Sequence, residues 1–252
     1  TSVGGESHLN IARLNPDGSP VSAFTASVST DVLCLALQPD RKILVGGRRF
    51  AVGGETRDGL ARLNPDGTLD TAFRPSVPGG VFTLALQADG KILLGGDFLT
   101  VNGVARQRIA RLNPNGTLDT AFNPGANATV LTLAVQADGR IVAGGAFTRL
   151  AGASRSRLGR VLPNGSADVE FNPSANSTVQ ALALQQDGKL LVAGAFSQLS
   201  GQRSDGLDRL NHTSAATEDL TYQGGNLTWL RDGSGPEFWR TAFEISADGV
   251  VW

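Results

Sequence analysis

The chain is poor in the side chains that build disulfides, metal sites and strongly charged surfaces. Its 252 residues contain one Cys, two His and no Met, and 22 basic side chains nearly balance 23 acidic ones. A single Cys excludes an internal disulfide and a Cys-based zinc site, and two His exclude a His-rich metal cluster. The balanced charge argues against a nucleic-acid partner, and the hydrophobic content of 40% argues against a disordered chain.

Long apolar segments are also missing. No run of 18 or more apolar residues occurs, so the sequence predicts no membrane insertion. No basic and then apolar leader precedes Thr1, and the absence of Met leads us to expect a removed leader or a segment of a longer chain. Charged residues make up only 18% of the chain. Gly accounts for 32 of the 252 residues, well above its average share of about 7%, and this high glycine content favours turn-rich β structure.

What the chain does have is an internal repeat with a constant step of 49 residues. The motif RLNPDG and its variants begin at Arg13, Arg62, Arg111, Arg160 and Arg209. A second motif, LALQPD, ends at Asp40 and returns with the same step as LALQAD, LAVQAD and LALQQD. Two motifs in one register predict tandem copies of a single structural unit.

Within one unit the pattern predicts four short antiparallel strands. Apolar residues alternate or form short runs at 81–87, 91–95, 108–113 and 117–122, without the spacing of a helix. The ADG and NPDG segments between these strands place Asp, Pro and Gly where tight turns need them. Four strands in about 40 to 50 residues match the size of one β-propeller blade.

Small residues indicate where the units pack together. The pairs Gly46-Gly47, Gly95-Gly96 and Gly144-Gly145 end the second strand, where a missing side chain lets a neighbouring backbone come close. Cys34 aligns with Thr83, Thr132 and Ala181 in the other units. We therefore expect Cys34 to be a small buried packing residue.

The sequence thus predicts an all-β fold, a five-bladed β-propeller of 49-residue repeats with four antiparallel strands per blade. N- and C-terminal segments share the last blade. The expected single domain comprises a half blade at 1–30, repeats at 31–79, 80–128, 129–177 and 178–216, and an irregular C-terminal segment at 217–252.

The C-terminal segment carries a weaker copy of the first two strands. Residues 243–249 correspond to 84–90 with a displacement of 12 residues from the repeat register, and Trp252 then aligns with Leu93. This segment either closes its own ring or is donated to a neighbouring subunit, because a terminal strand can complete either one.

The repeated segments LARLNPDGTLDTAF and VFTLALQADGKILLGGDFLTVNG resemble the delta-60 type repeats found in tandem in bacterial, often exported, proteins. The resemblance covers residues 1 to about 212. It implies a propeller-like fold and an extracellular or cell-surface location. It supplies no catalytic residues.

No sequence pattern of a catalytic or cofactor site is present, so we expect a non-enzymatic protein without cofactor or metal. Weak calcium binding at the NPDGTLD turn, through Asp66 and Asp70, is the metal alternative. A glycosidase is the enzymatic alternative, because acidic residues that break the repeat could act near the propeller axis. These acids are Glu55, Asp97, Glu170, Asp205, Asp208 and Glu237.

Two groups of residues are candidates for binding. The connections at 48–59, 97–108 and 146–157 differ between repeats, and variable loops on a rigid scaffold usually carry binding. Their candidates are Arg48, Arg106 and Arg155. Aromatic residues gather near the C-terminus, where sugars could stack or an interface could have its anchors. This group consists of Tyr222, Trp229, Trp239, Phe243 and Trp252.

From these features we expect a structural or adhesive module that associates with itself, as a homo-oligomer or a fibre. The contact would use C-terminal strand donation or face-to-face stacking, because the turn end of the units is rich in Asp and the opposite end in Arg. The alternative is a lectin-like propeller whose repeated sites bind glycans weakly and gain avidity from their number.

Overall fold

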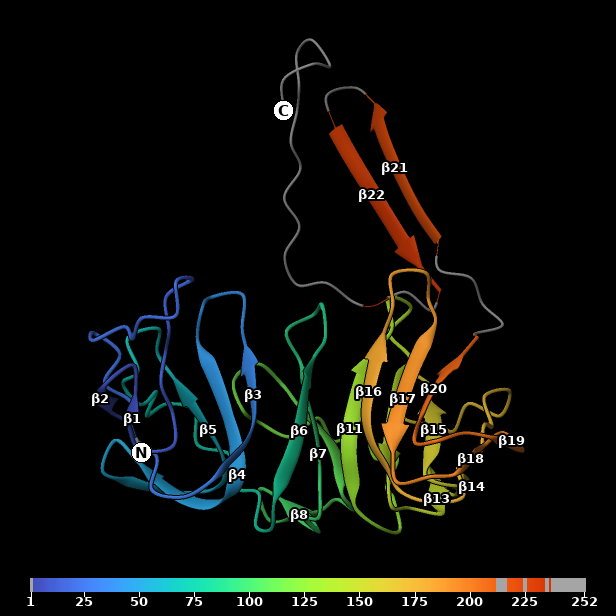
Figure 1. Cartoon of the computed structure of the whole chain (residues 1–252), viewed down its shortest axis with the longest axis horizontal. Coiled ribbons are helices and arrows are strands. Elements are labelled where there is room, and N and C mark those ends of the chain that lie inside the picture. The colour runs from blue at the N-terminus through green and yellow to red at the C-terminus, as the bar shows by residue number, and fades with distance from the viewer. Residues whose placement is uncertain (1, 212–216, 224–225, 234–235, 237–252) are drawn as a thin grey trace.

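The computed structural model describes residues 2–211, 217–223, 226–233 and 236, and every regular element within them is a β-strand (Figure 1). In this part of the chain no helix has the length and apolar character needed to span a bilayer. The predicted all-β class is therefore confirmed.

Four three-stranded antiparallel sheets follow one another along the chain, each with its second strand in the middle. Their strands are β3 (Val32–Leu37), β4 (Ile43–Val52) and β5 (Glu55–Leu63); β6 (Val81–Leu86), β7 (Ile92–Gly96) and β10 (Ile109–Leu112); β11 (Val130–Val135), β12 (Ile141–Gly145) and β15 (Leu158–Val161); β16 (Val179–Leu184), β17 (Leu190–Gly194) and β20 (Leu207–Leu210). Each sheet lies within one 49-residue unit, as the repeat requires.

The fourth strand expected in each blade is reduced to a single bridge. In the second unit, Leu112 pairs with Leu118 across the NPNG turn, and equivalent bridges occur in the units before and after it. The strand stops there because the chain turns again at Asp119, whose carboxylate accepts a hydrogen bond from the Ala121 N–H at 3.1 Å. Each of these three blades is thus a three-stranded sheet with one bridge at its outer edge.

The connections after the middle strands, expected as variable loops, are β-hairpins. Three of them are separate: β8 (Thr100–Val101) with β9 (Val104–Ala105), β13 (Arg149–Leu150) with β14 (Ala153–Ser154), and β18 (Gln198–Leu199) with β19 (Gln202–Arg203). In the first unit the hairpin is continuous with β4 and β5. Asn102 and Gly103 have φ angles of 50° and 76°, which are the two positive values that a type I′ turn requires.

Apolar side chains on the two faces of the middle strands β4, β7 and β12 enter two different cores. Leu94 points into the core shared with the preceding unit, whereas its neighbour Leu93 points into the core shared with the following unit. This alternation is the ordinary period of a strand, and it places every interior sheet between two others. The stack of sheets is the packing expected of propeller blades.

Glycine allows the units to approach closely. A Cβ atom on Gly95 would lie 2.8 Å from Cγ1 of Val130 in the next unit, whereas one on Gly96 would overlap the carbonyl oxygen of Gly80 in the same unit. The predicted close approach of a neighbouring backbone is confirmed at Gly96, and Gly95 makes room for the next unit. Cys34 is half-buried beside the core between the first two sheets, and burial raises the pKa of its thiol to about 12.

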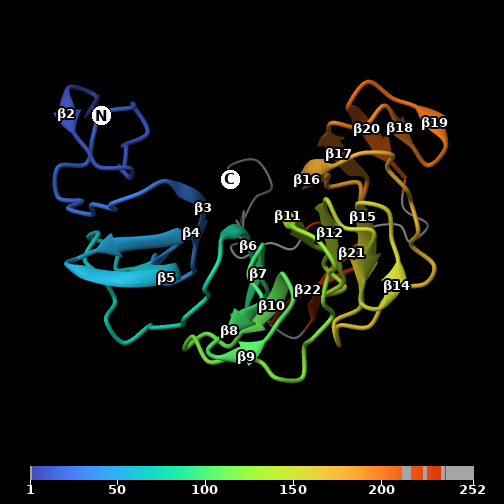
Figure 2. The same cartoon turned by 90° about the horizontal axis from the view of Figure 1, so that it is seen from below.

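The sheets follow an arc, with the N-terminal segment at one end and the sheet of β16, β17 and β20 at the other (Figure 2). The N-terminal segment contains β1 (Ser2–Val3), β2 (Glu6–Ser7) and the bridge Leu14–Pro20. A further hairpin of β21 (Thr217–Gln223) and β22 (Asn226–Asp232) stands away from the sheets in Figure 1. The C-terminal strands expected to complete a shared blade lie outside the described residues.

Candidate functional site

The most regularly repeated polar residues hold neighbouring units together. Nε of Arg111 donates a hydrogen bond to Asp119 at 2.9 Å, and its Nη1 donates to the carbonyl oxygen of Pro163 in the next unit at 2.8 Å. The guanidinium carbon lies 4.3 Å from the centre of the Phe122 ring. The same cluster recurs around Arg62, so the RLNPDG motif has a structural role.

The carboxylates of the NPDGTLD turn already have hydrogen-bond donors. Oδ1 of Asp66 accepts from the Thr68 N–H at 2.9 Å and from the Thr68 hydroxyl at 2.7 Å, and these bonds lower the pKa of Asp66. Burial raises the pKa of Asp70, but bonds from Lys42 and Arg62 outweigh burial and hold it below its usual value. Among the described residues no three His, Cys, Asp or Glu side chains gather as metal ligands would.

Two of the three arginines expected to bind a ligand are buried. Arg106 and Arg155 are 5% and 6% exposed. Arg106 donates to the carbonyl oxygens of Ala105 at 2.8 Å and Thr120 at 3.1 Å, and Arg155 donates to those of Ser154 at 2.7 Å and Asp168 at 2.7 Å. These guanidinium groups therefore fasten a hairpin to the turn that follows the outer strand instead of facing solvent.

Arg48 is exposed and lies near the axis of the arc. Its Nη2 is 2.9 Å from Asp97 Oδ2, and its guanidinium carbon is 5.3 Å from the centre of the Phe82 ring. Arg48 lines a cavity of about 540 Å³. The other lining residues occupy equivalent positions in the first strands of the four sheets, and they are Leu33, Phe82, Leu131 and Gln180. Asp97, one of the acids that break the repeat, is thus held in an ion pair.

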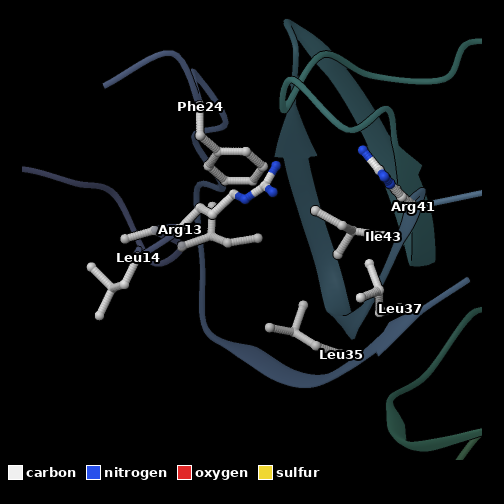
Figure 3. A pocket seen from close by; sticks show the side chains of 9 residues that line it. Arg13, Leu14, Phe24, Leu35, Leu37, Arg41 and Ile43 are labelled. Carbon is white, nitrogen blue, oxygen red and sulfur yellow. The ribbon is translucent and has the colours of Figure 1, made fainter. Parts of the chain in front are cut away.

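An apolar groove lies between β3 and the N-terminal segment (Figure 3). Its volume is about 470 Å³, and its walls include Arg13, Leu14, Phe24, Leu35, Leu37, Arg41 and Ile43. Leu37 is 65% exposed, whereas Leu86 and Val135, its equivalents in the next two units, are 9% and 8% exposed. The groove therefore exposes residues that the repeat elsewhere buries.

The opposite end of the arc has a matching exposed face. Leu207 in β20 is 67% exposed, although its equivalents Ile109 and Leu158 are fully buried. Sequence reasoning missed both ends, since the residues there are the ordinary core residues of the repeat. Only their position at an end of the arc distinguishes Leu37 and Leu207, and no residue type signals it.

One wall of the groove is a backbone edge that pairs with no other strand of the described residues. Residues 11–14 correspond to β10, which pairs with β7 throughout its length. Within the described part of the chain, residues 11–14 form a single bridge, between Leu14 and Pro20. The edge that faces the groove therefore presents backbone groups that a further strand could pair with.

The predicted aromatic cluster is only partly described. Tyr222 lies in β21 opposite Leu227, and Trp229 lies in β22 opposite Leu220. The remaining members, Trp239, Phe243 and Trp252, lie outside the described residues.

The C-terminal hairpin is tied to the third sheet. Pro236 forms a bridge with Gln136, and the N–H of Asp138 donates to the carbonyl oxygen of Gly233 at 3.4 Å. Gln136 directly follows β11, so this contact lies at the turn end of the inner strands.

Hollows at equivalent positions occur between neighbouring units at two places in the described chain. One of about 390 Å³ is lined by Ser156, Arg157, Ser174, Ala175, Asn176, Gln198 and Gly201. Three units earlier, equivalent positions line another, among them Leu9, Ser27, Ser29, Ala51 and Gly54. Asn176 is fixed by the N–H groups of Ser197 and Gln198, which donate to its Oδ1 at 2.9 and 3.1 Å.

Comparison with known proteins agrees with this architecture. Residues 1–20, 38–73, 87–122, 136–171 and 185–212 match a family model described as a domain of unknown function (DUF5122) beta-propeller. No curated protein and no solved structure matches the chain. The five matched segments recur along the chain with the repeat and cover more than half of it. The chain therefore belongs to the DUF5122 beta-propeller family.

Proposed function

We propose that this chain is a non-enzymatic structural or adhesive module that acts outside the cell or at its surface and associates with copies of itself. The exposed leucines at the two ends of the arc carry this proposal. Leu37 and Leu207 occupy core positions of the repeat, yet they are 65% and 67% exposed. Exposed apolar surface next to an unpaired strand edge is typical of a protein interaction site.

The ends support association better than the faces do. Several aspartates of the turn end are engaged within the chain, since Asp119 pairs with Arg111 at 2.9 Å and Asp70 with Arg62 at 2.9 Å. Such pairs reduce the charge available for face-to-face stacking. We therefore assign self-association to the groove and to the Leu207 face.

The proposal is tested by measuring the molar mass of the protein with light scattering over a wide range of concentration. The wild type is expected to show concentration-dependent oligomers, and a variant carrying Leu35→Ser and Leu37→Ser is expected to stay monomeric. Leu99→Ser is the matched control, because Leu99 is 54% exposed and lies away from both ends of the arc. A wild type that is monomeric at every concentration would contradict the proposal.

A lectin-like function is the second candidate, and the recurrent hollows between units favour it. In the hollow near Gln198, serine and glutamine side chains offer hydrogen-bond partners for sugar hydroxyls, and repetition would give avidity. Screening the protein on a glycan array tests this function. Binding that Gln198→Ala weakens, while Leu35→Ser with Leu37→Ser leaves it intact, would favour the lectin over the assembly module.

A further inference from the structure

The N-terminal segment provides only the outer part of a fifth unit. Residues 11–14 correspond to β10, and the bridge Leu14–Pro20 corresponds to Leu112–Leu118. In the second unit β10 pairs with β7, and β7 pairs with β6. Among the described residues no strand occupies these two places beside residues 11–14. A complete fifth unit needs two more strands, between the groove and the Leu207 face.

The last residues of the chain have the sequence pattern of those two strands. Residues 243–249 correspond to 84–90, and Trp252 corresponds to Leu93. In the same alignment, Arg240 corresponds to Val81, the first residue of β6. This segment, 240–252, lies outside the described residues, so its destination has to be inferred from what the described part permits.

The position of Pro236 limits which groove the segment can reach. Pro236 pairs with Gln136, at the turn end of β11, whereas an inner strand begins at the level of Val130. Six residues of strand separate these levels, which is about 20 Å. Arg240 is four residues after Pro236, and four residues of fully extended chain reach at most about 14 Å, which is less than this separation. While Pro236 keeps this contact, the segment cannot begin the inner strand of its own fifth unit.

We propose that residues 240–252 of one copy complete the fifth unit of a second copy, by entering its groove between β3 and residues 11–14. This inference rests on the proposed self-association and names the contact that produces it. The register follows from the second unit, where Ile92 pairs with Leu112 and Leu93 with Arg111. Val251 is therefore placed opposite Leu14, and Trp252 opposite Arg13.

The apolar residues of the segment match the two exposed faces. Leu93 lies in the core shared with the following unit, so the alignment directs Trp252 toward Leu35 and Leu37. Ile92 lies in the core shared with the preceding unit, so Val251 is directed toward the Leu207 face. One pair of strands thus covers both ends of the arc at once.

The charges match as well. Glu244 aligns with Ala85, which packs on the same side as Leu93, so the alignment directs Glu244 into the groove. The groove contains Arg13 and Arg41, and neither forms an ion pair within the described part of the chain. An acidic side chain that enters there would meet two cations.

The proposed contact joins unlike surfaces, a C-terminal segment and a groove. Such a contact leaves a free groove at one end of every pair and a free segment at the other. Repetition therefore produces a fibre, or a ring if the rotation between copies closes.

A disulfide between two different single-cysteine variants tests the proposal. Leu14→Cys and Val251→Cys are prepared separately, mixed under native conditions and oxidised, because paired residues of neighbouring strands are close enough for a disulfide. Native Cys34 stays in place, and its half-buried thiol, with a pKa raised to about 12, is a poor competitor. The expected result is at least ten times more disulfide-linked dimer in the mixture than in either variant alone.

Two other outcomes would overturn the inference. If the mixture does not cross-link but a chain carrying both substitutions forms an intrachain disulfide, the segment completes its own blade. If neither cross-link forms, the segment does not occupy the groove. Light scattering on the wild type then separates self-association from the proposed contact. If the wild type forms oligomers although no cross-link forms, the protein associates with itself through a contact other than the groove. Circular dichroism confirms that each variant is folded.

Discussion

The interior of the arc and its two ends are built from the same repeated residues, but these residues have different surroundings. Leu158 is fully buried between two sheets, whereas Leu207, one repeat later, is 67% exposed. Gly144 is closely approached by Val179, whereas the equivalent residue of the last unit is Ala193. The repeat therefore supplies a complete interface only where another unit follows. Its ends are unfinished interfaces, available to a further segment of polypeptide.

The largest effect is expected in the interior, at the aromatic ring that Arg111 covers. Phe122 is fully buried, so Phe122→Ala should lower the free energy of unfolding by about 3–5 kcal/mol, through lost burial and the cavity left behind. Urea denaturation checks this value. A loss as small as that of an exposed residue would show that the interior units are not tightly packed.

The comparison of equivalent leucines is the most direct one. Leu158→Ala should lower the free energy of unfolding by about 2–5 kcal/mol, because Leu158 is fully buried. Leu207→Ala should change it by about 0.5 kcal/mol or less at a concentration where the protein is monomeric. Thermal unfolding of both variants at low and high concentration measures the difference. A loss at Leu207 that appears only at high concentration would show that association covers this face.

The glycine position should respond in the same way, with a smaller effect. A Cβ atom on Gly144 would lie 2.6 Å from Cγ1 of Val179, so Gly144→Val should destabilise the fold by about 1–3 kcal/mol. Ala193→Val is the matched control, and it should be nearly neutral in the monomer because no described unit packs there. Equal losses in the two variants would contradict the distinction between interior and end.

The smallest effect concerns acid stability. Burial raises the pKa of Asp119, but Arg111 and Lys91 outweigh burial and hold it below its usual value. Stability from this carboxylate is thus present at neutral pH and is lost as the pH falls from about 4 through the lower pKa of the folded state. Asp119→Asn should remove on the order of 1 kcal/mol at pH 7 and flatten the acid limb of a stability profile. Asp31→Asn, at an exposed aspartate, should leave the profile unchanged.

The N-terminal end of the arc should lack this acid-sensitive pair. Eight residues after Arg13 stands Val21, where the interior units have Asp70, Asp119 and Asp168. The Arg–Asp pairs at Asp70, Asp119 and Asp168 should therefore contribute to acid stability, whereas the N-terminal segment around Arg13 should not.

Most of the fold could be predicted from the sequence because each unit is encoded locally. The strands at 81–86, 92–96 and 109–112 fall within one or two residues of the predicted ones, since short apolar runs and turn residues define them. The hairpins were not foreseen, because Ala151-Gly152 and Ser200-Gly201 are weaker signals of a type I′ turn than Asn102-Gly103. The fourth strand was overestimated, because a turn at Asp119 follows its first bridge.

The candidate site was much less predictable. Arg106 and Arg155 look like surface residues of a variable loop, but the hairpins bury them and their guanidinium groups bond to backbone carbonyls. Leu35 and Leu37 look like core residues, but they line a groove. Exposure depends on which units are neighbours in space, and a repeated sequence has the same letters in both situations.

The sequence by itself determined the repeat of 49 residues, the three main strands of each unit and the glycines at which units meet. These features depend on interactions within a unit or with the next one, and each repeat contains the residues for them. Only the tertiary structure decided that the described residues leave the Leu37 and Leu207 faces exposed, and that Pro236 contacts Gln136 at the turn end of β11. The physical reason is that burial is a property of the whole arrangement, so identical residues are core in the interior and surface at the ends.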